Sequence, residues 1–288
     1  MPDAAMYIAK REANGGCRLF EPEMHERVLR RLELRADLQE ALASCQLELH
    51  YQPVVLLADG SVSGVEALLR WHHPDHGMIA PGEFIPLAEE TGLIISIGRW
   101  VLREGCRNAQ RLFAAMPGRT PTLAINVSLR QLQDTDIVMD VHEALTESGM
   151  NPASLTLEIT ESVLADTELA VARLSELKAL GVRLALDDFG TGYSSLSYLS
   201  RFPIDVLKMD RSFLRDDVKR TTDLTPAVLA IGRTLGIEVV AEGIELAEQT
   251  TRLRDLGCAH GQGFFFARPM DVDATLDFLS GCAALSPR

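Results

Sequence analysis

The sequence predicts an α/β protein built as a modified (β/α)8 barrel of the TIM type. Three observations support this fold class: short β-rich runs alternate with longer amphipathic runs, the β-rich runs number eight, and α/β barrels commonly use about 250 residues as one domain, close to the 288 present. This alternation favours a mainly parallel sheet with helices outside it. The expected strands are residues 47–52, 64–69, 123–127, 155–159, 183–186, 206–209, 238–241 and 263–267.

Helical periodicity fills the segments between these strands. Apolar residues recur at helical spacing over 94–116, 162–180, 226–235 and 246–256. Glycine follows three of these segments, where a left-handed helix cap is favoured: Gly181, Gly236 and Gly257. Before the first strand, a charged segment from residue 21 to about residue 44 carries apolar residues four apart. We interpret residues 21–36 as a connector helix and residues 37–288 as the barrel domain.

Composition excludes several classes of function. The chain has 28 Lys plus Arg against 41 Asp plus Glu, a formal charge of −13, which disfavours binding to a nucleic-acid polymer through a basic face. Its apolar runs fall far short of the roughly 18 residues that a membrane span needs, and it does not begin with a signal peptide. We therefore expect a cytoplasmic location and no membrane contact by this part of the protein.

Polar residues close or interrupt successive strands, where a packed barrel interior favours apolar side chains. In a (β/α)8 barrel the carboxyl ends of the strands converge on one face, which holds the active site. A single acid at such a place is usually a helix cap or a surface ion pair, but a run over successive strands is not explained in that way. These residues are Glu66, Asn126, Glu158, Glu161, Asp187, Asp188, Lys208, Asp210, Glu242 and Gln262.

Carboxylates gathered in one cleft repel each other unless cations neutralise them. A ligand set made only of oxygen, without His or Cys, favours Mg²⁺ or Mn²⁺ over Zn²⁺. One carboxylate that bridges two such ions is typical of in-line phosphoryl chemistry. The strand-end residues therefore predict a site for divalent metal ions.

The ordered motifs around these residues resemble the EAL-domain cyclic di-GMP phosphodiesterases, and the resemblance runs from about Leu32 to Phe278. Any one of these motifs is weak evidence for the family, but the whole set in this order is specific to it. The motifs are Glu66-Ala67-Leu68-Leu69-Arg70-Trp71, Asn126-Val127-Ser128, Glu158-Ile159-Thr160-Glu161, Asp187-Asp188-Phe189-Gly190, Leu207-Lys208-Met209-Asp210, Glu242-Gly243 and Gln262-Gly263, together with Tyr51-Gln52-Pro53 and Phe84-Ile85-Pro86.

The resemblance implies a barrel whose first strand runs antiparallel to the others, and a substrate, cyclic di-GMP, that is opened to linear pGpG. It implies two Mg²⁺ or Mn²⁺ ions per site. Glu66, Asn126, Glu158 and Asp187 would hold one metal ion. Asp187 would bridge to a second ion, which Asp188 also supports.

The resemblance also implies roles for the remaining residues. Lys208 would contact the attacking water and the charge developing on phosphorus, and Glu242 would position that water or accept its proton. Which of the two is the base stays open, since a cation accepts no proton unless its pKa is depressed. Glu161 would hold the loop that follows the fifth strand; the alternative is an acid favoured by a helix N-terminus. The residues expected to contact the substrate are Gln52, Arg70 as a phosphate clamp, Pro86, Asp210 and Gln262.

The first twenty residues resemble the last helix and strand of a diguanylate cyclase (GGDEF) domain, although the cyclase signature loop is missing. We interpret residues 1–20 as a remnant of such an upstream domain and the chain as a segment of a longer tandem protein, compatible with membrane or sensor segments upstream. We expect no cyclase activity. The loop after the fifth strand is also a candidate surface for a homodimer.

Three further motifs have more ordinary interpretations. The run 190–195 lacks the full dinucleotide-binding fingerprint and is better interpreted as a βα loop. His72, His73 and His76 lie among turn residues, which favours a structural or solvated role over a metal cluster. The aromatic run 264–266 is interpreted as core of the eighth strand.

Two rival functions come from other classes. A receptor that binds cyclic di-GMP without cutting it would be expected to lack a metal ligand or the loop glutamate, yet all of them are present here. An enolase-type lyase also uses strand-end acids and a lysine, but the ordered motif set argues against it. We therefore expect a metal-dependent phosphodiesterase.

Overall fold

The computed structural model describes residues 22–161, 167–190, 201–214 and 224–285. These residues form two compact units. The first unit combines the described residues up to Leu47 with Arg70–Leu93, and the second, called the barrel unit below, combines Glu48–Leu69 with the described residues from Ile94 onward. The expected cyclase-like remnant, residues 1–20, lies outside the described residues. Within them, none of the helices is both long enough and apolar enough to span a lipid bilayer.

The barrel is a closed ring of eight strands. They are β1 (Leu47–Leu56), β2 (Val62–His73), β4 (Thr122–Asn126), β5 (Leu155–Thr160), β6 (Arg183–Phe189), β7 (Val206–Met209), β8 (Glu238–Ala241) and β9 (His260–Gly261). Their order in the sheet is β1-β9-β8-β7-β6-β5-β4-β2, and pairing between β1 and β2 closes the ring. Each neighbouring pair in the series β2, β4, β5, β6, β7, β8, β9 is parallel. Strand β1 is antiparallel to β9, as the resemblance implied.

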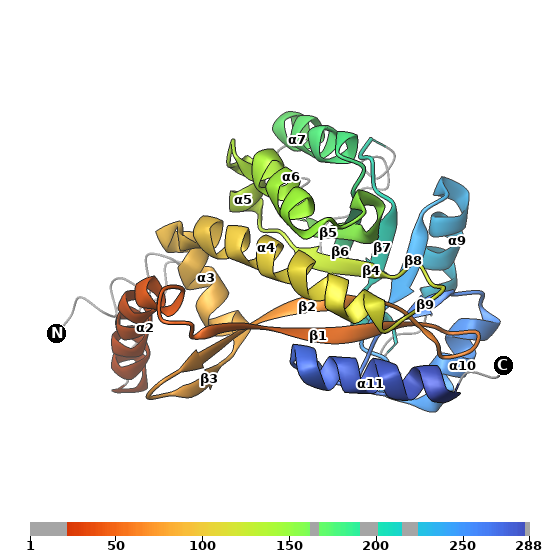
Figure 1. The fold of residues 1–288 in the computed structure, drawn as a ribbon, viewed down its shortest axis with the longest axis horizontal. Coiled ribbons are helices and arrows are strands. Elements are labelled where there is room, and N and C mark those ends of the chain that lie inside the picture. The colour runs from red at the N-terminus through yellow and green to blue at the C-terminus, as the bar shows by residue number, and fades with distance from the viewer. Residues whose placement is uncertain (1–21, 162–166, 191–200, 215–223, 286–288) are drawn as a thin grey trace. The chain divides into compact units, whose positions relative to one another are not determined.

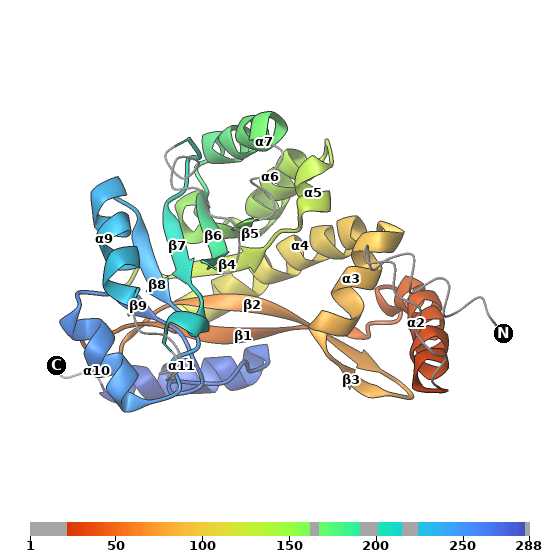
Figure 2. The same ribbon diagram turned by 180° about the vertical axis from the view of Figure 1, so that it is seen from behind.

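Helices cover the outside of this ring (Figures 1 and 2). They are α4 (Leu93–Ala114), α5 (Leu129–Gln133), α6 (Ile137–Ser148), α7 (Thr167–Ala179), α9 (Thr225–Leu235), α10 (Ala247–Asp255) and α11 (Val272–Leu285), with short 3-10 turns η1 (Pro152–Ser154) and η3 (Arg211–Phe213). The outer sides of the strands pack under these helices; on β4, for example, Leu123 and Ile125 are buried. The hydrophobic core therefore lies between the ring and its helices.

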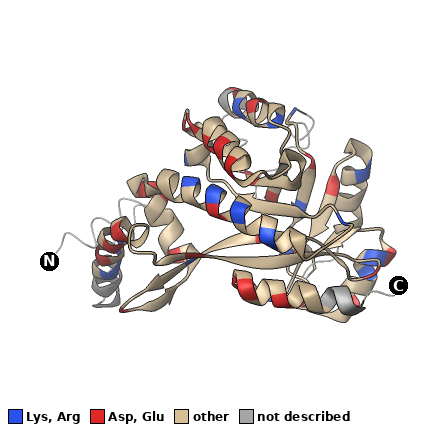
Figure 3. Ribbon diagram, in the orientation of Figure 1, with Lys and Arg blue, Asp and Glu red and all other residues tan. Residues whose placement is uncertain are grey.

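Arginines at four-residue spacing on α4 join neighbouring helices, and they are visible as blue segments in Figure 3. Arg99 Nε lies 2.5 Å from Asp140 Oδ1 and Arg103 Nη2 lies 2.7 Å from Glu143 Oε2, both acids being on α6. Because these arginines already have acidic partners, they indicate helix packing and not an anion-binding surface.

The first unit contains α2 (Pro22–Ala41), β3 (Gly77–Ile79) and α3 (Pro81–Thr91). The expected helix before the barrel is confirmed, but it extends to Ala41; the domain boundary at residue 37 stays a prediction. Ion pairs join α2 to α3: Arg30 Nε to Glu83 Oε1 at 2.6 Å and Arg31 Nη2 to Glu90 Oε1 at 2.7 Å.

His73 has the structural role that the sequence predicted. Its Nε2 lies 3.1 Å from Asp37 Oδ2 on α2, and its Nδ1 accepts hydrogen bonds from the backbone N–H groups of Asp75 and His76. The ring thus ties the turn after β2 to the first helix. Strand β3, which closes a hairpin on β2, was not predicted from the sequence.

The eighth strand was predicted in the wrong place. The ring closes through His260–Gly261, and residues 263–266 form a turn in which Phe265 N–H donates to the Ile244 carbonyl. Phe264 and Phe265 are 50% and 44% exposed, so their assignment to the core was also wrong. The chain turns here because Gly263 lies against the backbone of Ile244, which leaves no room for an extended strand with side chains.

We predict that Gly263→Ala destabilises the protein by about 3 kcal/mol, because its Cβ would lie 2.1 Å from the Ile244 carbonyl oxygen, a backbone atom that cannot swing away. Gly82→Ala is the control: no atom lies within 4 Å of its Cβ, and its stability should change by less than about 1 kcal/mol. Denaturant unfolding of both variants measures the difference. Equal stabilities would contradict the close approach at Gly263.

Candidate active site

One layer of the barrel interior is polar, and it lies at the carboxyl ends of the parallel strands. Side chains alternate between the two faces of a strand, so one residue on or just after each strand enters this layer. The antiparallel β1 contributes from its middle. The layer consists of Gln52, Glu66, Asn126, Glu158, Asp187, Lys208, Glu242 and Gln262. All eight were expected from the sequence to belong to the site.

Lys208 on β7 lies at the centre of this layer. Its Nζ is 2.7 Å from Glu158 Oε2 and 2.8 Å from Glu242 Oε1. It is also 3.3 Å from Asp187 Oδ1 and 3.4 Å from Glu66 Oε2. Since Lys208 and Glu158 are each only 3% exposed and Glu66 is 5% exposed, the ammonium meets these two carboxylates almost without water, whereas Asp187 and Glu242 are partly exposed. The lysine therefore compensates like charges that would otherwise repel each other.

Side-chain amides hold the orientation of Glu66. Asn126 Nδ2 donates to Glu66 Oε1 at 2.8 Å, and Gln262 Nε2 donates to Glu66 Oε2 at 2.7 Å. Gln262 Nε2 also lies 3.0 Å from Gln52 Oε1, and Gln52 Nε2 donates to the Ala267 carbonyl at 3.0 Å. These contacts give Gln52 and Gln262 a structural task in addition to the substrate contact expected of them.

The environment shifts the pKa of four charged groups in the layer: Glu66, Glu158, Lys208 and Glu242. Burial raises the pKa of Glu242 to about 8 and, with the nearby Glu66, raises that of Glu158 well above its usual value. Burial would also raise the pKa of Glu66, but Lys208 and the amides of Gln262 and Asn126 lower it. Burial alone would lower the pKa of Lys208, yet the surrounding carboxylates raise it well above the ordinary range. Lys208 therefore remains an ammonium.

A bulge in β6 brings two aspartates to the same side of the site. The pairing register between β6 and β7 shifts between Leu186 and Phe189, and Asp188 has a φ of 55°, in the left-handed region. Asp188 N–H donates to Asp187 Oδ1 at 2.9 Å. Carboxylate oxygens of Asp187, Asp188 and Glu242 all lie within 4.8 Å of one another, a spacing that one cation can span. Burial and the charge of Asp187 raise the pKa of Asp188.

Glu161 accepts a hydrogen bond from the Gly190 N–H, with Oε1 at 2.8 Å. This contact lies where the segment after β6 begins, as the interpretation of Glu161 as a loop anchor requires. Gly190 has a φ of 95°, and a Cβ there would lie 2.2 Å from the Phe213 ring. Residues 191–195, including the expected homodimer surface, lie outside the described residues.

A cavity of about 270 Å³ opens beside the polar layer. Gln52, Glu66, Glu242 and Gln262 are among the residues that line it. Asp210 also lines it, while its Oδ1 accepts from Ser212 N–H at 2.8 Å and so caps η3. The exposed residues Arg211 and Phe264 also line the cavity, and neither was predicted from the sequence to belong to the site. The position of Phe264 directly after Gln262-Gly263 could have indicated its place in the site, but the sequence analysis assigned Phe264 to a strand.

Arg70 and Pro86, also expected to contact the substrate, belong to the first unit. Arg70 follows Leu69 on β2, and Pro86 lies within α3. Their contact with substrate stays a prediction.

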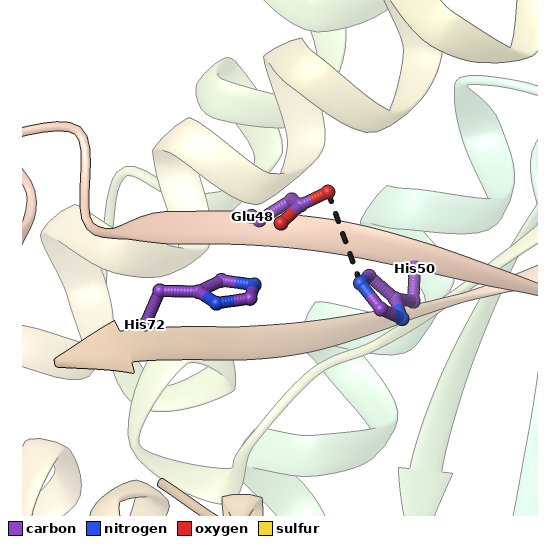
Figure 4. Close-up of side chains that lie close together, drawn as sticks. All are labelled: Glu48, His50 and His72. Atoms are coloured by element: carbon purple, nitrogen blue, oxygen red, sulfur yellow. Dashed lines mark ion pairs between the residues drawn. The ribbon is translucent and has the colours of Figure 1, made fainter. Parts of the chain in front are cut away.

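On β1, His50 Nε2 lies 3.8 Å from Glu48 Oε1 (Figure 4). Residues two apart share one face of a strand, which explains the pair. A partly exposed pair at this distance contributes little to stability.

The residues of the polar layer fit divalent metal ions of the Mg²⁺ or Mn²⁺ type. Their donors are carboxylate and amide oxygens, which hard cations prefer. Five carboxylates of the site (Glu66, Glu158, Asp187, Asp188 and Glu242) carry five negative charges when ionised, against one positive charge on Lys208. Two divalent ions would balance the remaining four charges.

The fold and this cluster define an eight-stranded α/β barrel with a buried cluster of carboxylates, amides and one lysine at the carboxyl ends of its parallel strands. The EAL domain family model matches residues 35–269, and the chain belongs to that family. It is 45% identical over 277 residues to the "Bifunctional diguanylate cyclase/cyclic di-GMP phosphodiesterase MucR" of Pseudomonas aeruginosa, covering 95% of this chain and 40% of that relative. It is 41% identical over 275 residues to "Cyclic di-GMP phosphodiesterase PdeR" of Escherichia coli K12, covering 94% and 41%.

A similar solved structure is "PaMucR Phosphodiesterase, c-di-GMP complex", with a TM-score of 0.79 and 46% identity over 84% of this chain and 99% of that one. The likeness to this solved structure confirms the expected fold. The chain spans about two fifths of the length of the two curated relatives. The family match also removes the enolase-type alternative.

We predict that Lys208→Met lowers the free energy of unfolding of the metal-free protein by about 3–5 kcal/mol, because it leaves buried carboxylates without their counter-charge. Lys178→Met is the control: Lys178 pairs with Asp205 at 2.8 Å, but both side chains are about a third exposed, so its loss should cost no more than about 1 kcal/mol. Denaturant unfolding in chelator measures both. Equal small losses would show that Lys208 does not compensate the cluster.

Proposed function

We propose that this chain hydrolyses cyclic di-GMP to linear pGpG in a reaction that requires Mg²⁺ or Mn²⁺. The observation that carries the proposal is the convergence of Glu66, Asn126, Glu158, Asp187 and Asp188 around Lys208 and Glu242 in an EAL barrel. Relatives of high identity are named for this activity, and a similar solved structure holds cyclic di-GMP. We expect the reaction in the cytoplasm, where a guanine-nucleotide messenger acts.

The expected ligands divide into two groups. Glu66, Asn126, Glu158 and Asp187 would hold one ion; Asp187 and Asp188 would hold the second. When bound, such ions lower the pKa of a water molecule and neutralise charge that develops on a phosphoryl group. The bulge in β6 supports this division, because carboxylate oxygens of Asp187 and Asp188 lie within 4.8 Å of each other and of a Glu242 oxygen.

Glu242 is the better candidate to accept the proton of the attacking water. It lines the cavity, and burial raises its pKa to about 8, near the pH at which a general base is most effective. Lys208 holds its proton and donates to Glu158 and Glu242, so its task is to orient these carboxylates and offset their charge. Addition of water at phosphorus breaks the bond to one sugar oxygen and leaves a phosphomonoester and a hydroxyl.

The direct test incubates the protein with cyclic di-GMP in Mg²⁺, Mn²⁺, Ca²⁺ or chelator and separates the products. We expect pGpG with Mg²⁺ or Mn²⁺ alone, because a phosphate held between two ions depends on a spacing of roughly 3.5–4 Å, which the larger Ca²⁺ does not reproduce. Equal rates in Mg²⁺, Ca²⁺ and chelator would contradict the two-metal mechanism.

Asp187→Asn distinguishes hydrolysis from the rival function, in which the protein is a receptor that binds cyclic di-GMP without cutting it. This near-isosteric change removes a metal ligand and a like charge while the barrel core stays intact. We expect turnover to fall by several orders of magnitude and the melting temperature of the metal-free protein to stay level or rise. Substrate binding without turnover in the unmodified protein, under all metal conditions, would favour the receptor.

Glu161→Ala tests the anchoring of the segment after β6. Loss of the hydrogen bond to Gly190 should let Asp188 shift, lowering kcat strongly, changing KM little and raising the metal concentration needed. Glu161→Gln keeps an acceptor oxygen and should recover part of kcat and of the metal affinity. If both variants match the unmodified protein, Glu161 is only an acid at a helix terminus.

A further inference from the structure

Phe264 lies half exposed beside the candidate active site. Strand β9 ends at Gly261, and Phe264 follows in the turn beyond it, with 50% of its surface exposed. It lines the same cavity of about 270 Å³ as Gln262 and Glu242. Leaving half of a large apolar side chain in water forgoes the stabilisation that its burial would give. Its place in the cavity wall makes it available for contact with a bound molecule.

The turn that carries Phe264 is fixed on both sides. Phe265 N–H donates to the Ile244 carbonyl at 3.0 Å, and the Ala267 carbonyl accepts from Gln52 Nε2 at 3.0 Å. Ile244 follows β8 and Gln52 lies on β1, so segments from two strands of the ring hold the turn. A surface that is fixed before binding loses little conformational freedom when a ligand arrives.

Arg268 covers one side of the Phe264 ring. Its guanidinium carbon lies over the ring, 4.3 Å from the centroid, which is a cation–π contact. This contact restricts the orientation of the ring and leaves its edge and second face for the cavity. The neighbouring Phe265 is similarly exposed, at 44%, but it packs edge-on against Phe266, with the centroids 5.1 Å apart, and it does not line the cavity.

The charges around Phe264 favour an uncharged group at this part of the cavity. Asp210, Glu242 and Glu245 line the cavity with it, against one arginine, Arg211. An excess of carboxylates disfavours a phosphate in the absence of metal ions, whereas a neutral nucleobase meets no such repulsion. Guanine also presents N–H groups on its Watson–Crick edge, which carboxylates can accept.

The distance from Phe264 to the polar layer suits a nucleotide. Phe264 is two residues after Gln262, and two residues of chain span at most about 7 Å. In the proposed reaction a phosphodiester lies beside Glu242, and a base joined to it through one sugar lies further along the cavity. Stacking on an aromatic side chain is a common way for proteins to bind a base that is not paired.

We propose that Phe264, held in place by Arg268, is a stacking platform for one guanine base of the substrate. This inference rests on the proposed hydrolysis of cyclic di-GMP, because the substrate supplies the base. The base itself does not change while the phosphodiester is cleaved, so the contact stabilises bound substrate and transition state alike. Phe264 therefore determines substrate affinity and KM, and not kcat.

Calorimetric titration with cyclic di-GMP in Ca²⁺, where we expect no turnover, measures affinity, and initial rates in Mg²⁺ measure KM and kcat. Phe264→Ala should weaken binding and raise KM by about tenfold or more, the loss typical of one stacked base, with kcat changed by less than about twofold. Phe265→Ala is the matched control and should change neither. Arg268→Met should weaken binding by a smaller factor, because the ring remains but loses its restraint.

Two further variants separate stacking from a structural role of the side chain. Phe264→Tyr should restore affinity, whereas Phe264→Leu, apolar but without a π face, should not. Phe264→Trp supplies a spectroscopic signal: cyclic di-GMP should quench the emission of the introduced indole, because the base stacks on it, and should leave the emission of Phe265→Trp unchanged. Melting curves show that the variants are folded.

The outcomes separate this inference from the proposed function. If the unmodified chain hydrolyses cyclic di-GMP and Phe264→Ala has the same affinity and KM, or if Phe265→Ala weakens binding equally, the platform is overturned and the hydrolysis stands. If the unmodified chain binds without hydrolysis and Phe264→Ala binds more weakly, the platform stands and the hydrolysis is overturned. Absence of binding by the unmodified chain overturns both.

Discussion

The burial of one ammonium among several carboxylates is the constraint on which the rest of this structure depends. An isolated buried charge costs several kcal/mol, and removing one member of a buried pair leaves the other uncompensated. Lys208 contacts four carboxylates within 3.4 Å at a place with almost no access to water. The barrel must therefore hold five strands in a fixed register, since a slip of one residue would turn a charged side chain into the apolar helix layer.

This requirement explains how stability is distributed. The inner face of the ring carries the polar layer, and a second cavity, of about 540 Å³, lies beneath it, so the interior contributes less apolar burial than a filled barrel interior would. The outer face compensates, because residues such as Leu123, Ile125, Leu155 and Leu184 are buried beneath the helices. In a barrel organised in this way, the apolar layer between strands and helices stabilises the fold, while the interior contains charged side chains and a cavity.

Backbone geometry at the site follows the same constraint. Asp187 and Asp188 are adjacent in sequence, and in a regular strand their side chains would point to opposite faces. The bulge in β6 and the left-handed φ of Asp188 bring both carboxylates to the side of Glu242. The strained residue is held by its neighbours: Asp188 N–H donates to Asp187, and Gly190 N–H donates to Glu161. Sites of this kind keep backbone strain because the surroundings define it.

The fold class, seven of the eight ring strands and seven of the eight members of the polar layer could be predicted from sequence patterns, because hydrophobic alternation and strand-end position are local properties of the chain. The eighth member, Gln52, was expected only from the resemblance to the EAL family. The prediction from sequence was wrong at the eighth strand. The three consecutive phenylalanines resemble a buried strand, but the chain turns at Gly263, which lies against the backbone of Ile244. Three features became visible only in the folded chain: Lys208 lies at the centre of the carboxylates, Gln262 donates a hydrogen bond to Glu66, and a second cavity lies beneath the polar layer. These features depend on distances between strands far apart in the chain, and no local pattern encodes such distances.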